Sequence, residues 1–346
     1  MNSHISSKKF KDEFGAFREK SVLITGGLGF IGSNLAIHLT ALGARVTLID
    51  SLIPEYGGNL WNILPVQDKV TVNISDIRDE HSMKYLVRGQ DFVFNLAGQT
   101  SHLDSMVNPH PDLEINARAQ LYLLEACRKY NPSIKIVFAS TRQIYGRPAY
   151  LPVDERHPMC PVDVNGVNKM AGEWYHIVYN KAYGIATTVL RLTNTYGPRM
   201  RVKDARQTFL GIWIRSCVEG KPFCVFGDGK QVRDFNYVDD VVRAFLLAAL
   251  SEDSNGEIYN LGAEDPINLK DTAKLLLEVN GSGSFDIVPF PEDRKQIDIG
   301  DYYSDYRKIR SKLGWKPSIP LADGLKETLA YYRSFGEHYW GQENGR

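Results

Sequence analysis

The sequence predicts an α/β fold with a doubly wound parallel sheet, and three observations support this. Short apolar runs alternate with longer helical segments over most of the first 260 residues. The apolar runs lack strict polar alternation, as expected of strands that are buried on both faces. A glycine-rich turn directly follows the first run. Strands that alternate with helices in this way form a parallel sheet covered by helices.

Each element has its own signal in the sequence. Residues 21–25 (SVLIT) form the first strand, and residues 31–42 have helical apolar spacing that stops at Gly43. The second strand, 45–49 (RVTLI), ends at Asp50. Further strands are expected at 70–73, 91–95, 135–139 and 186–191, and long helices at 113–129 and 166–183.

The pattern changes after residue 191. Glycine and proline are dense from 197 to 229, whereas a helix at 238–250 and a strand at 257–261 resemble the first half again. From residue 266 we expect helices and loops without another strong parallel strand. The predicted larger domain is therefore 18–191 plus about 230–262. A smaller α+β substrate domain would contain about 192–229 plus 263–340, and residues 1–17 would be an N-terminal extension.

Composition excludes several classes of protein. The 346 residues include 41 Lys and Arg and 41 Asp and Glu, so the formal net charge is zero. This balance argues against nucleic acid or a charged membrane surface as a partner. The four cysteines show no CxxC spacing, so we expect no metal site, and sparse cysteine fits the cytoplasm. The charged start is not a signal peptide, and no run is long enough to span a membrane.

The glycine-rich turn, residues 25–32 (TGGLGFIG), is the first motif with chemical meaning. It lies between a predicted strand and a predicted helix, where glycines permit a tight turn and close approach of a pyrophosphate. Asp50 ends the second strand, where a carboxylate binds ribose hydroxyls and repels a 2′-phosphate. This combination predicts a Rossmann-type domain that binds NAD rather than NADP.

Several further motifs extend the pattern, namely 75–79 (SDIRD), 95–98 (NLAG) and 233–241 (RDFNYVDDV). Together with the turn they resemble the extended short-chain dehydrogenase/reductase family. Within it, the similarity is to the NAD-dependent nucleotide-sugar epimerases and dehydratases, such as UDP-glucose 4-epimerase. It runs from about residue 21 to 332.

The resemblance implies a set of cofactor contacts. The pyrophosphate would be bound by Gly26, Gly29, Phe30 and Ile31, and the adenosine ribose by Asp50. The adenine would lie beside Asp76 and Ile77. The nicotinamide ribose would be bound by Ala97, Gly98 and Lys169.

The catalytic segment fits the family only in part. The family has a Ser or Thr after the fifth strand and then Tyr-x-x-x-Lys on the next helix. Thr141 and Lys169 match these positions, but Asn165 stands in place of the tyrosine. An asparagine amide orients a hydroxyl or a water and does not titrate usefully. The general base could then be Lys169, His102, Asp104 or Asp163, or a water held by Asn165 and Thr141 could relay the proton.

The pair Arg142-Gln143 also departs from the family. The 4,6-dehydratases typically carry Asp-Glu at these positions, so dehydration is disfavoured. An arginine beside the sugar would suit a carboxylate or a phosphate. Alternatively, the Arg142 side chain points to solvent or pairs with an acidic residue on the surface.

The substrate contacts implied by the resemblance lie mainly in the smaller domain. Asn194 and Arg233 match residues that contact the diphosphate, and Lys295 or Arg294 falls where another diphosphate arginine is expected. The nucleobase pocket would be lined by Phe209, Leu210, Cys224 and Phe226.

The predicted function is an NAD-dependent epimerase acting at C4 of a UDP-hexose or UDP-hexuronic acid through a 4-keto sugar. The alternatives are a nucleotide-sugar dehydratase, decarboxylase or reductase, and a binding protein without turnover. We also expect a homodimer, because the helices at 113–129 and 166–183 correspond to the family's interface helices. Their apolar residues would pack there: Leu121, Leu124, Trp174, Ile177 and Val178.

Overall fold

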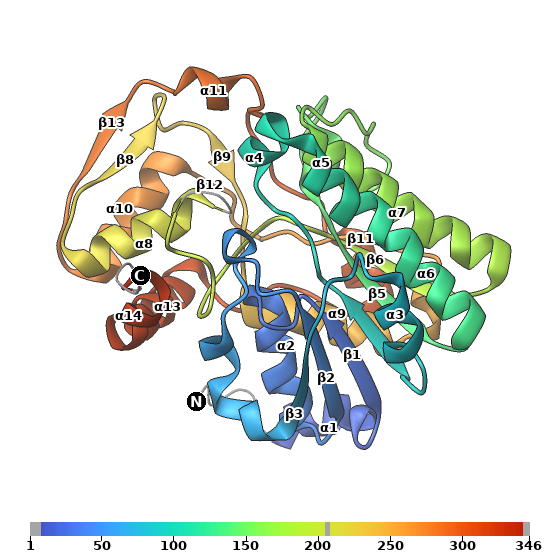
Figure 1. Ribbon diagram of the computed structural model, residues 1–346. Coiled ribbons are helices and arrows are strands. Elements are labelled where there is room, and N and C mark those ends of the chain that lie inside the picture. Colours follow the sequence, from blue (N-terminus) through green and yellow to red (C-terminus); the bar gives the residue numbers. More distant parts are fainter. Residues whose placement is uncertain (1–7, 205–207, 342–346) are drawn as a thin grey trace.

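A seven-stranded parallel sheet forms the centre of the larger domain (Figure 1). The computed structural model describes residues 8–204 and 208–341. The strand order is β3-β2-β1-β4-β5-β6-β11, and every neighbouring pair is parallel. The strands are β1 (Ser21–Thr25), β2 (Arg45–Asp50), β3 (Val70–Ile74), β4 (Phe92–Asn95), β5 (Lys135–Thr141), β6 (Ala186–Leu192) and β11 (Ile258–Asn260). This confirms the predicted fold class.

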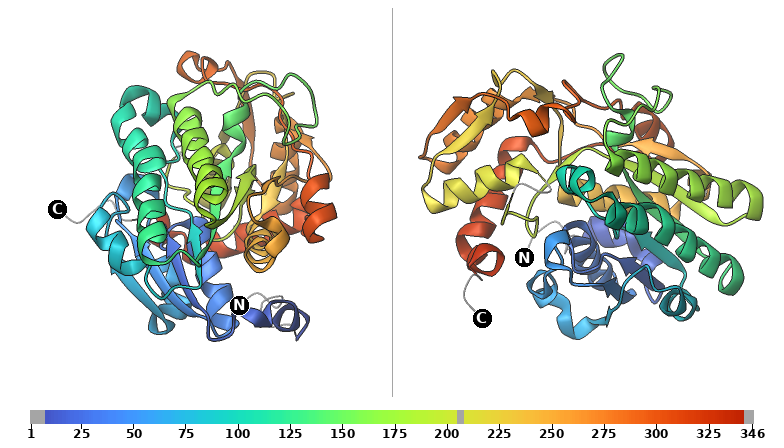
Figure 2. Two further views of the ribbon diagram at one scale, coloured as in Figure 1. Left: turned by 90° about the vertical axis from the view of Figure 1, so that its right-hand side faces the viewer. Right: turned by 45° about the horizontal axis from the view of Figure 1, so that its top comes forward.

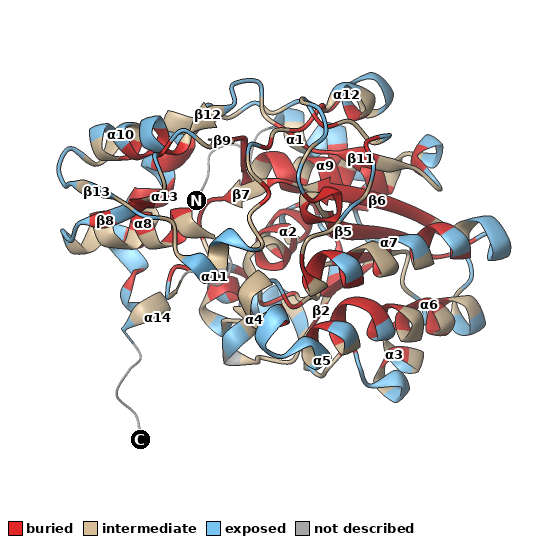
Figure 3. Ribbon diagram, turned by 90° about the horizontal axis from the view of Figure 1, so that it is seen from above, coloured by how far each residue is buried: buried red, intermediate tan, exposed pale blue. Residues whose placement is uncertain are grey.

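Helices cover both faces of this sheet, as Figures 1 and 2 show. One layer holds α2 (Phe30–Ala41) and α9 (Val238–Leu250), and the other holds α3 (Glu80–Leu86), α6 (Ala119–Tyr130) and α7 (Val164–Tyr183). Successive residues of β1 alternate between the two faces. Val22 and Ile24 belong to the core under α2 and α9, whereas Leu23 belongs to the core under α3 and α6. Figure 3 shows the buried strands between these layers.

The predicted helix 113–129 is not one regular helix. It starts with α5 (Pro109–Asp112), continues through a π-helical turn at Leu113–Arg118 and ends as α6. In the wide turn, the side chain of Gln120 donates to the carbonyl of Ile115 at 2.9 Å. A π-turn adds a residue and rotates the preceding segment. The segment before α6 therefore brings Asp112 and Asn116 towards the carboxyl end of the sheet.

Residues 8–17 of the predicted N-terminal extension pack on the sheet through two aromatic side chains, while most of this segment is exposed. They form α1 (Lys8–Phe14) and the 3₁₀ turn Gly15–Phe17. Phe14 and Phe17 are fully buried, and the ring centroids of Phe17 and Phe92 are 5.1 Å apart. These aromatic side chains cover apolar surface of the sheet. Residues 1–7 of the predicted extension lie outside the described residues.

The smaller unit contains three two-stranded sheets and several helices. The pairs are β8 (Phe223–Phe226) with β13 (Phe285–Val288), β9 (Val232–Arg233) with β12 (Ile267–Asn268), and β7 (Asn194–Tyr196) with β10 (Phe235–Tyr237). β8 and β13 are parallel, so the chain forms a further parallel strand after residue 266, where the sequence shows no strong signal for one. Asp286 and Ile287 of β13 are exposed, so this strand lacks the apolar run of a buried one. The predicted domain limits remain a prediction.

Helices complete the smaller unit and the loops around it. The remaining α-helices are α4 (His102–Val107), α8 (Phe209–Glu219), α10 (Leu269–Asn280), α11 (Glu292–Lys295), α12 (Arg307–Leu313), α13 (Leu321–Phe335) and α14 (Glu337–Trp340). Short 3₁₀ segments occupy Pro54–Tyr56, Leu60–Lys69, Arg142–Tyr145 and Glu252–Ser254. Among the described residues, none of the helices combines the length and apolar character needed to cross a bilayer.

Candidate functional site

Two cavities meet at the carboxyl ends of the central strands. The first cavity, about 290 Å³, is lined by the glycine turn and by the ends of β2, β4 and β5. The second cavity, about 680 Å³, is lined mainly by the smaller unit. Five residues line both and define the junction of the cavities: His102, Arg142, Gln143, Asn194 and Thr208. The strand order reverses between β1 and β4, which is where doubly wound sheets bind ligands.

The glycine turn closes tightly around the start of α2. Gly26 has a φ of +68°, and a Cβ there would lie 3.0 Å from the backbone nitrogen of Ala97. A Cβ at Gly32 would lie 2.2 Å from the carbonyl oxygen of Gly26. The turn thus presents bare backbone to the first cavity, next to the N–H groups at the start of α2. This cradle fits the pyrophosphate of a dinucleotide.

Asp50 and Asp76 line the same cavity. Asp50 accepts hydrogen bonds from the backbone N–H groups of Leu28 at 3.1 Å and Leu52 at 2.9 Å. Burial raises the pKa of Asp50, and these two N–H groups oppose the rise. Asp76 instead pairs with Arg78, whose Nη2 lies 2.6 Å from Oδ2. A carboxylate at the end of β2 fits an unphosphorylated ribose, so the residues present fit NAD.

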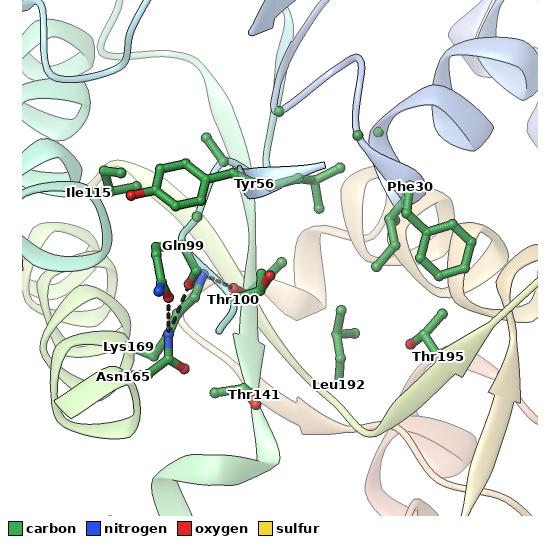
Figure 4. A pocket seen from close by; sticks show the side chains of 18 of the residues that line it. Phe30, Tyr56, Gln99, Thr100, Ile115, Thr141, Asn165, Lys169, Leu192 and Thr195 are labelled. Carbon is green, nitrogen blue, oxygen red and sulfur yellow. Dashed lines mark hydrogen bonds between the residues drawn. The ribbon is translucent and has the colours of Figure 1, made fainter. Parts of the chain in front are cut away.

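The other predicted cofactor residues also line the first cavity: Gly29, Phe30, Ile31, Ile77, Ala97, Gly98 and Lys169. Figure 4 shows Phe30 at one end of this cavity, with Asn165, Lys169 and Thr141 at the other. The cavity therefore extends from the glycine turn to the predicted catalytic residues.

Lys169 lies one helical turn after Asn165 on α7. Its Nζ donates to the carbonyl of Ala139 at 3.3 Å and lies 5.2 Å from the ring centroid of Phe138. Burial lowers the pKa of Lys169 to about 8, and the carboxylate of Asp112 opposes this shift. Thr141, at the end of β5, accepts a hydrogen bond from the backbone N–H of Gln143 at 3.2 Å. These three predicted catalytic residues therefore come together in the structure.

Asn165 is tied into a buried polar network. Its Nδ2 donates to the carbonyl of Gln99 and to Asp112 Oδ2, each at 2.8 Å. The other carboxylate oxygen of Asp112 accepts from Asn168 at 2.8 Å. Both hydrogens of the Asn165 amide are therefore used to join α7 to α5 and to the segment after β4. Sequence reasoning missed Gln99 and Asp112, although two asparagines one turn apart on a helix indicate a shared polar partner.

Tyr145 does not replace the missing phenol. Its side chain is fully buried, and its hydroxyl donates to Asn260 Oδ1 at 2.7 Å. It also accepts a hydrogen bond from Arg191. Burial raises the pKa of Tyr145, and Tyr145 lines neither cavity. Its hydroxyl is therefore committed to holding β5, β6 and β11 together.

Arg142 and Arg233 place two cations beside the second cavity. In the described part of the chain, no carboxylate pairs with the Arg142 guanidinium, and its buried Nε has no hydrogen-bond partner. Arg233 Nη1 donates to the carbonyls of Val232 and Gly300. Burial lowers the pKa of both arginines, that of Arg233 to about 10, and the charge of Arg142 adds to the lowering at Arg233. Two neighbouring cations of this kind indicate an anion-binding site.

Aromatic side chains line the far part of the second cavity, where the nucleobase was expected. Phe209, Cys224 and Phe226 line it, and Asn194 lies at the junction. Sequence reasoning missed Trp213 and Phe290, the latter with its ring centroid 6.0 Å from that of Phe226. Trp213 lies within α8 and Phe290 in a loop, and neither position carries a sequence signal for a ligand pocket.

Two predicted residues lie outside both cavities. Leu210 is buried on the inner face of α8, and Lys295 is exposed beside Glu292 at 3.5 Å. Arg294 lines the second cavity instead, with its guanidinium carbon 5.6 Å from the Phe226 ring centroid. Neighbouring helical side chains point about 100° apart, so only one of the two basic residues faces the cavity. Of the two alternatives, the lining of the cavity favours Arg294 over Lys295.

The predicted dimer helices expose only part of the expected apolar surface. Trp174 and Val178 of α7 are 42% and 49% exposed, and Val167 on the same helix is also exposed. Leu124 and Ile177 are buried inside the chain, under the sheet and its helices, so they are not available to a partner.

Comparison with known proteins gives one family. The model of the NAD dependent epimerase/dehydratase family matches residues 22–262. This match supports the predicted family and its NAD cofactor at the level of the family.

Solved structures and curated relatives agree with this match but differ in reaction. The UDP-glucose 4-epimerase of Thermotoga maritima, solved with UDP-glucose, is 33% identical with a TM-score of 0.83, covering 92% of this chain and 100% of that one. The dTDP-glucose 4,6-dehydratase DesIV of Streptomyces venezuelae, solved with NAD, is 27% identical with a TM-score of 0.84, covering 92% and 98%. The UDP-glucuronic acid decarboxylase 1 of Xenopus tropicalis is 30% identical over 92% of this chain and 73% of its own length.

Proposed function

The chain belongs to the NAD dependent epimerase/dehydratase family, and on that premise we propose that it inverts C4 of a UDP-linked hexose or hexuronic acid. One observation carries the proposal. The cavity that fits NAD and the cavity with two arginines open into each other at Arg142 and Asn194, next to Thr141. A sugar whose diphosphate lies beside Arg233 would therefore reach the residues at the end of β5.

When bound, NAD would supply the hydride chemistry that inversion at C4 requires. The chain would bind the pyrophosphate at Gly26, Gly29, Phe30 and Ile31, the ribose at Asp50, and the adenine beside Asp76 and Ile77. Lys169 would hold the nicotinamide ribose, close to Ala97 and Gly98. Thr141 would orient the sugar hydroxyl. Asn165 would hold the backbone at Gln99 in place through its hydrogen bond to the Gln99 carbonyl.

Epimerisation is favoured over dehydration by the residues that follow Thr141. A 4,6-elimination needs one group to donate a proton to the leaving hydroxyl and another to remove the C5 proton. Arg142 remains charged, and the amide of Gln143 donates to Asp163 Oδ2 at 2.7 Å. Arg142 and Gln143 therefore supply neither the acid nor the base that a 4,6-elimination requires.

A hexuronic acid is favoured over a neutral hexose by Arg142. Its guanidinium lies 5.5 Å from the ring centroid of Tyr302. Among the described residues no carboxylate forms a close ion pair with it, and Asp234 and Asp298 act on it only at longer range. A buried cation without a close counter-ion is costly, and a sugar carboxylate would provide one at contact distance.

A homodimer remains part of the proposal. Val167, Trp174 and Val178 form an exposed apolar stripe on α7, at the spacing of one helix face. A second copy that packs this stripe against its own would remove it from water. Light scattering at micromolar concentration should give twice 39.1 kDa, and Trp174→Glu should give the monomer mass.

The test is a panel of UDP-, dTDP-, GDP- and CDP-sugars, each as hexose and hexuronic acid, followed by NMR and mass spectrometry. We expect a C4 epimer of unchanged mass and no net reduction of NAD. Loss of water or of carbon dioxide would instead indicate a dehydratase or a decarboxylase.

Arg142→Gln should reduce turnover of the hexuronic acid more than that of the matching hexose, and an equal reduction would contradict the role of Arg142. Binding without any product would show a protein that binds nucleotide sugars without turnover.

A further inference from the structure

His102 and Asp163 form a contact at the junction of the two cavities. His102 is the first residue of α4, and Asp163 caps the N-terminus of α7, two residues before Asn165. The imidazole Nδ1 lies 3.0 Å from Asp163 Oδ2. The Asp163 side chain is fully buried, whereas that of His102 is 33% exposed and lines both cavities.

Two hydrogen-bond donors hold the Asp163 carboxylate in place, and His102 lies beside it. Oδ1 accepts from the backbone N–H of Gly166 at 2.6 Å, and Oδ2 accepts from Gln143 Nε2 at 2.7 Å and faces His102. Burial alone would raise the pKa of Asp163, but His102 and these hydrogen bonds outweigh it, so that the pKa is lowered. The carboxylate is therefore ionised and fixed beside the imidazole.

The edge of the ring that bears Nδ1 is buried against Asp163. The exposed third of the side chain is therefore the rest of the ring, including the edge that carries Nε2. The Nδ1–H direction is not aligned with Oδ2 in this structure. Catalytic hydrogen bonds are often misaligned before substrate binds.

Other candidates for proton transfer are less well placed. Asp104 lines only the second cavity. The amide of Asn165 does not titrate, and the phenol of Tyr145 is buried outside both cavities. Lys169 lines the first cavity but not the second, and its Nζ donates to the carbonyl of Ala139. At the junction, His102 has an adjacent carboxylate and an edge that faces the cavities.

We propose that His102 takes and returns the proton of the sugar hydroxyl, with Asp163 as the positioning residue that holds its ring. This inference rests on the proposed function. The O4–H bond breaks, its proton moves to Nε2, and its electrons form the C4=O bond while the C4 hydride goes to NAD. In the return step Nε2 gives the proton back to O4 as the hydride returns to C4. The carboxylate of Asp163 stabilises the imidazolium that exists between the two steps.

The test compares four variants with the wild-type protein. His102→Ala should lower kcat by about 10²–10⁴-fold and leave NAD content and KM within a few-fold. Added imidazole should restore part of the lost kcat. Asp163→Asn keeps a residue suited to capping α7 and should still lower kcat, because it removes the charge. His110→Ala, an exposed histidine of α5, is the control and should change nothing, with or without imidazole. His102→Gln should remain inactive in imidazole, because its side chain occupies the space.

A second measurement does not depend on turnover. Long-range ¹H–¹⁵N NMR of ¹⁵N-histidine protein, with His102 assigned by the His102→Gln variant, reports which nitrogen carries the proton. We expect the Nδ1–H tautomer in the wild type and a shift towards Nε2–H in Asp163→Asn. An Nε2–H tautomer in the wild type, or full kcat in His102→Ala, would overturn the inference. If the wild type converts no sugar, the proposed function fails, while the tautomer still decides whether the pair is formed.

Discussion

Replacing Asn165 with Asp turns a hydrogen-bond donor into an acceptor where acceptors already converge. Nδ2 of Asn165 lies 2.8 Å from both Asp112 Oδ2 and the carbonyl of Gln99, and both side chains are buried. Aspartate has nearly the same shape, so the packing would be kept. Two carboxylates would instead face each other across the distance that the hydrogen bond now spans.

The loss of stability in Asn165→Asp is limited either by the repulsion between the two carboxylates or by the cost of protonating one of them. Two like charges at this separation repel by about 4–6 kcal/mol at an effective dielectric constant near 20. The pair avoids this repulsion by keeping a proton, which costs about 1.4 kcal/mol for each pH unit above the ordinary carboxyl pKa near 4. The penalty is then about 1.5 kcal/mol at pH 5 and rises to about 4–6 kcal/mol at pH 8. The ammonium of Lys169, which interacts with Asp112, reduces the upper value.

The sign of the pH dependence is fixed by the raised pKa of the pair in the folded state. The penalty is absent below about pH 4, where both folded and unfolded chains hold the proton, and it grows as the pH rises towards the folded pKa. Urea unfolding at pH 5, 6.5 and 8 measures it. Asn165→Ala is the matched control, since it loses about 1.5–3 kcal/mol of charge-assisted hydrogen bonding and adds no charge. If Asn165→Asp lost no more stability at pH 8 than at pH 5, the amide would not face Asp112.

Three further predictions address the cofactor and the catalytic helix. Purified protein should release NAD and not NADP when it is denatured, as measured by enzymatic assay. Asp50→Ala should lower the NAD content of the purified protein. Release of NADP alone would contradict the role of Asp50. Asn165→Tyr should lower turnover at least tenfold and lower the free energy of unfolding by about 1–3 kcal/mol, because the ring overfills a buried site; a gain of epimerase activity over the wild type would contradict this. Lys169→Met should abolish turnover yet raise the free energy of unfolding of the cofactor-free protein at pH 7 by about 1–3 kcal/mol, because burial disfavours the ammonium whose pKa is lowered to about 8. This gain should shrink as the pH rises from 8 to 10.5, and a gain independent of pH would argue against a buried ammonium.

The central sheet could be predicted because its signals are local. A buried strand such as β1 or β5 is a continuous apolar run, and the glycine turn lies in eight neighbouring residues. β13 was missed because a strand of a two-stranded sheet is half solvent-exposed and has no such run. The π-turn before α6 was missed because its apolar spacing departs little from that of an α-helix.

The candidate site was predictable residue by residue, but not as a network. The sequence indicates Thr141, Asn165 and Lys169 through their spacing on one strand end and one helix. Nothing in the spacing reveals that Asn165 bonds to Asp112, or that His102 lies 3.0 Å from Asp163, because these pairs are 53 and 61 residues apart and form only when the chain folds. Choosing Arg294 over Lys295 likewise required the direction of each side chain in α11.

The hydrogen-bond network around Asn165 also constrains which substitutions at this position can be tolerated during evolution. A return to tyrosine in one step would remove both donors from the buried Asp112 and Gln99 while adding a ring to a filled space. The intermediate would be less stable before any activity was regained. A viable route would first neutralise Asp112, for example as Asn, and only then exchange residue 165. The buried carboxylate of Asp112 therefore constrains the order in which substitutions at this site can occur without loss of stability.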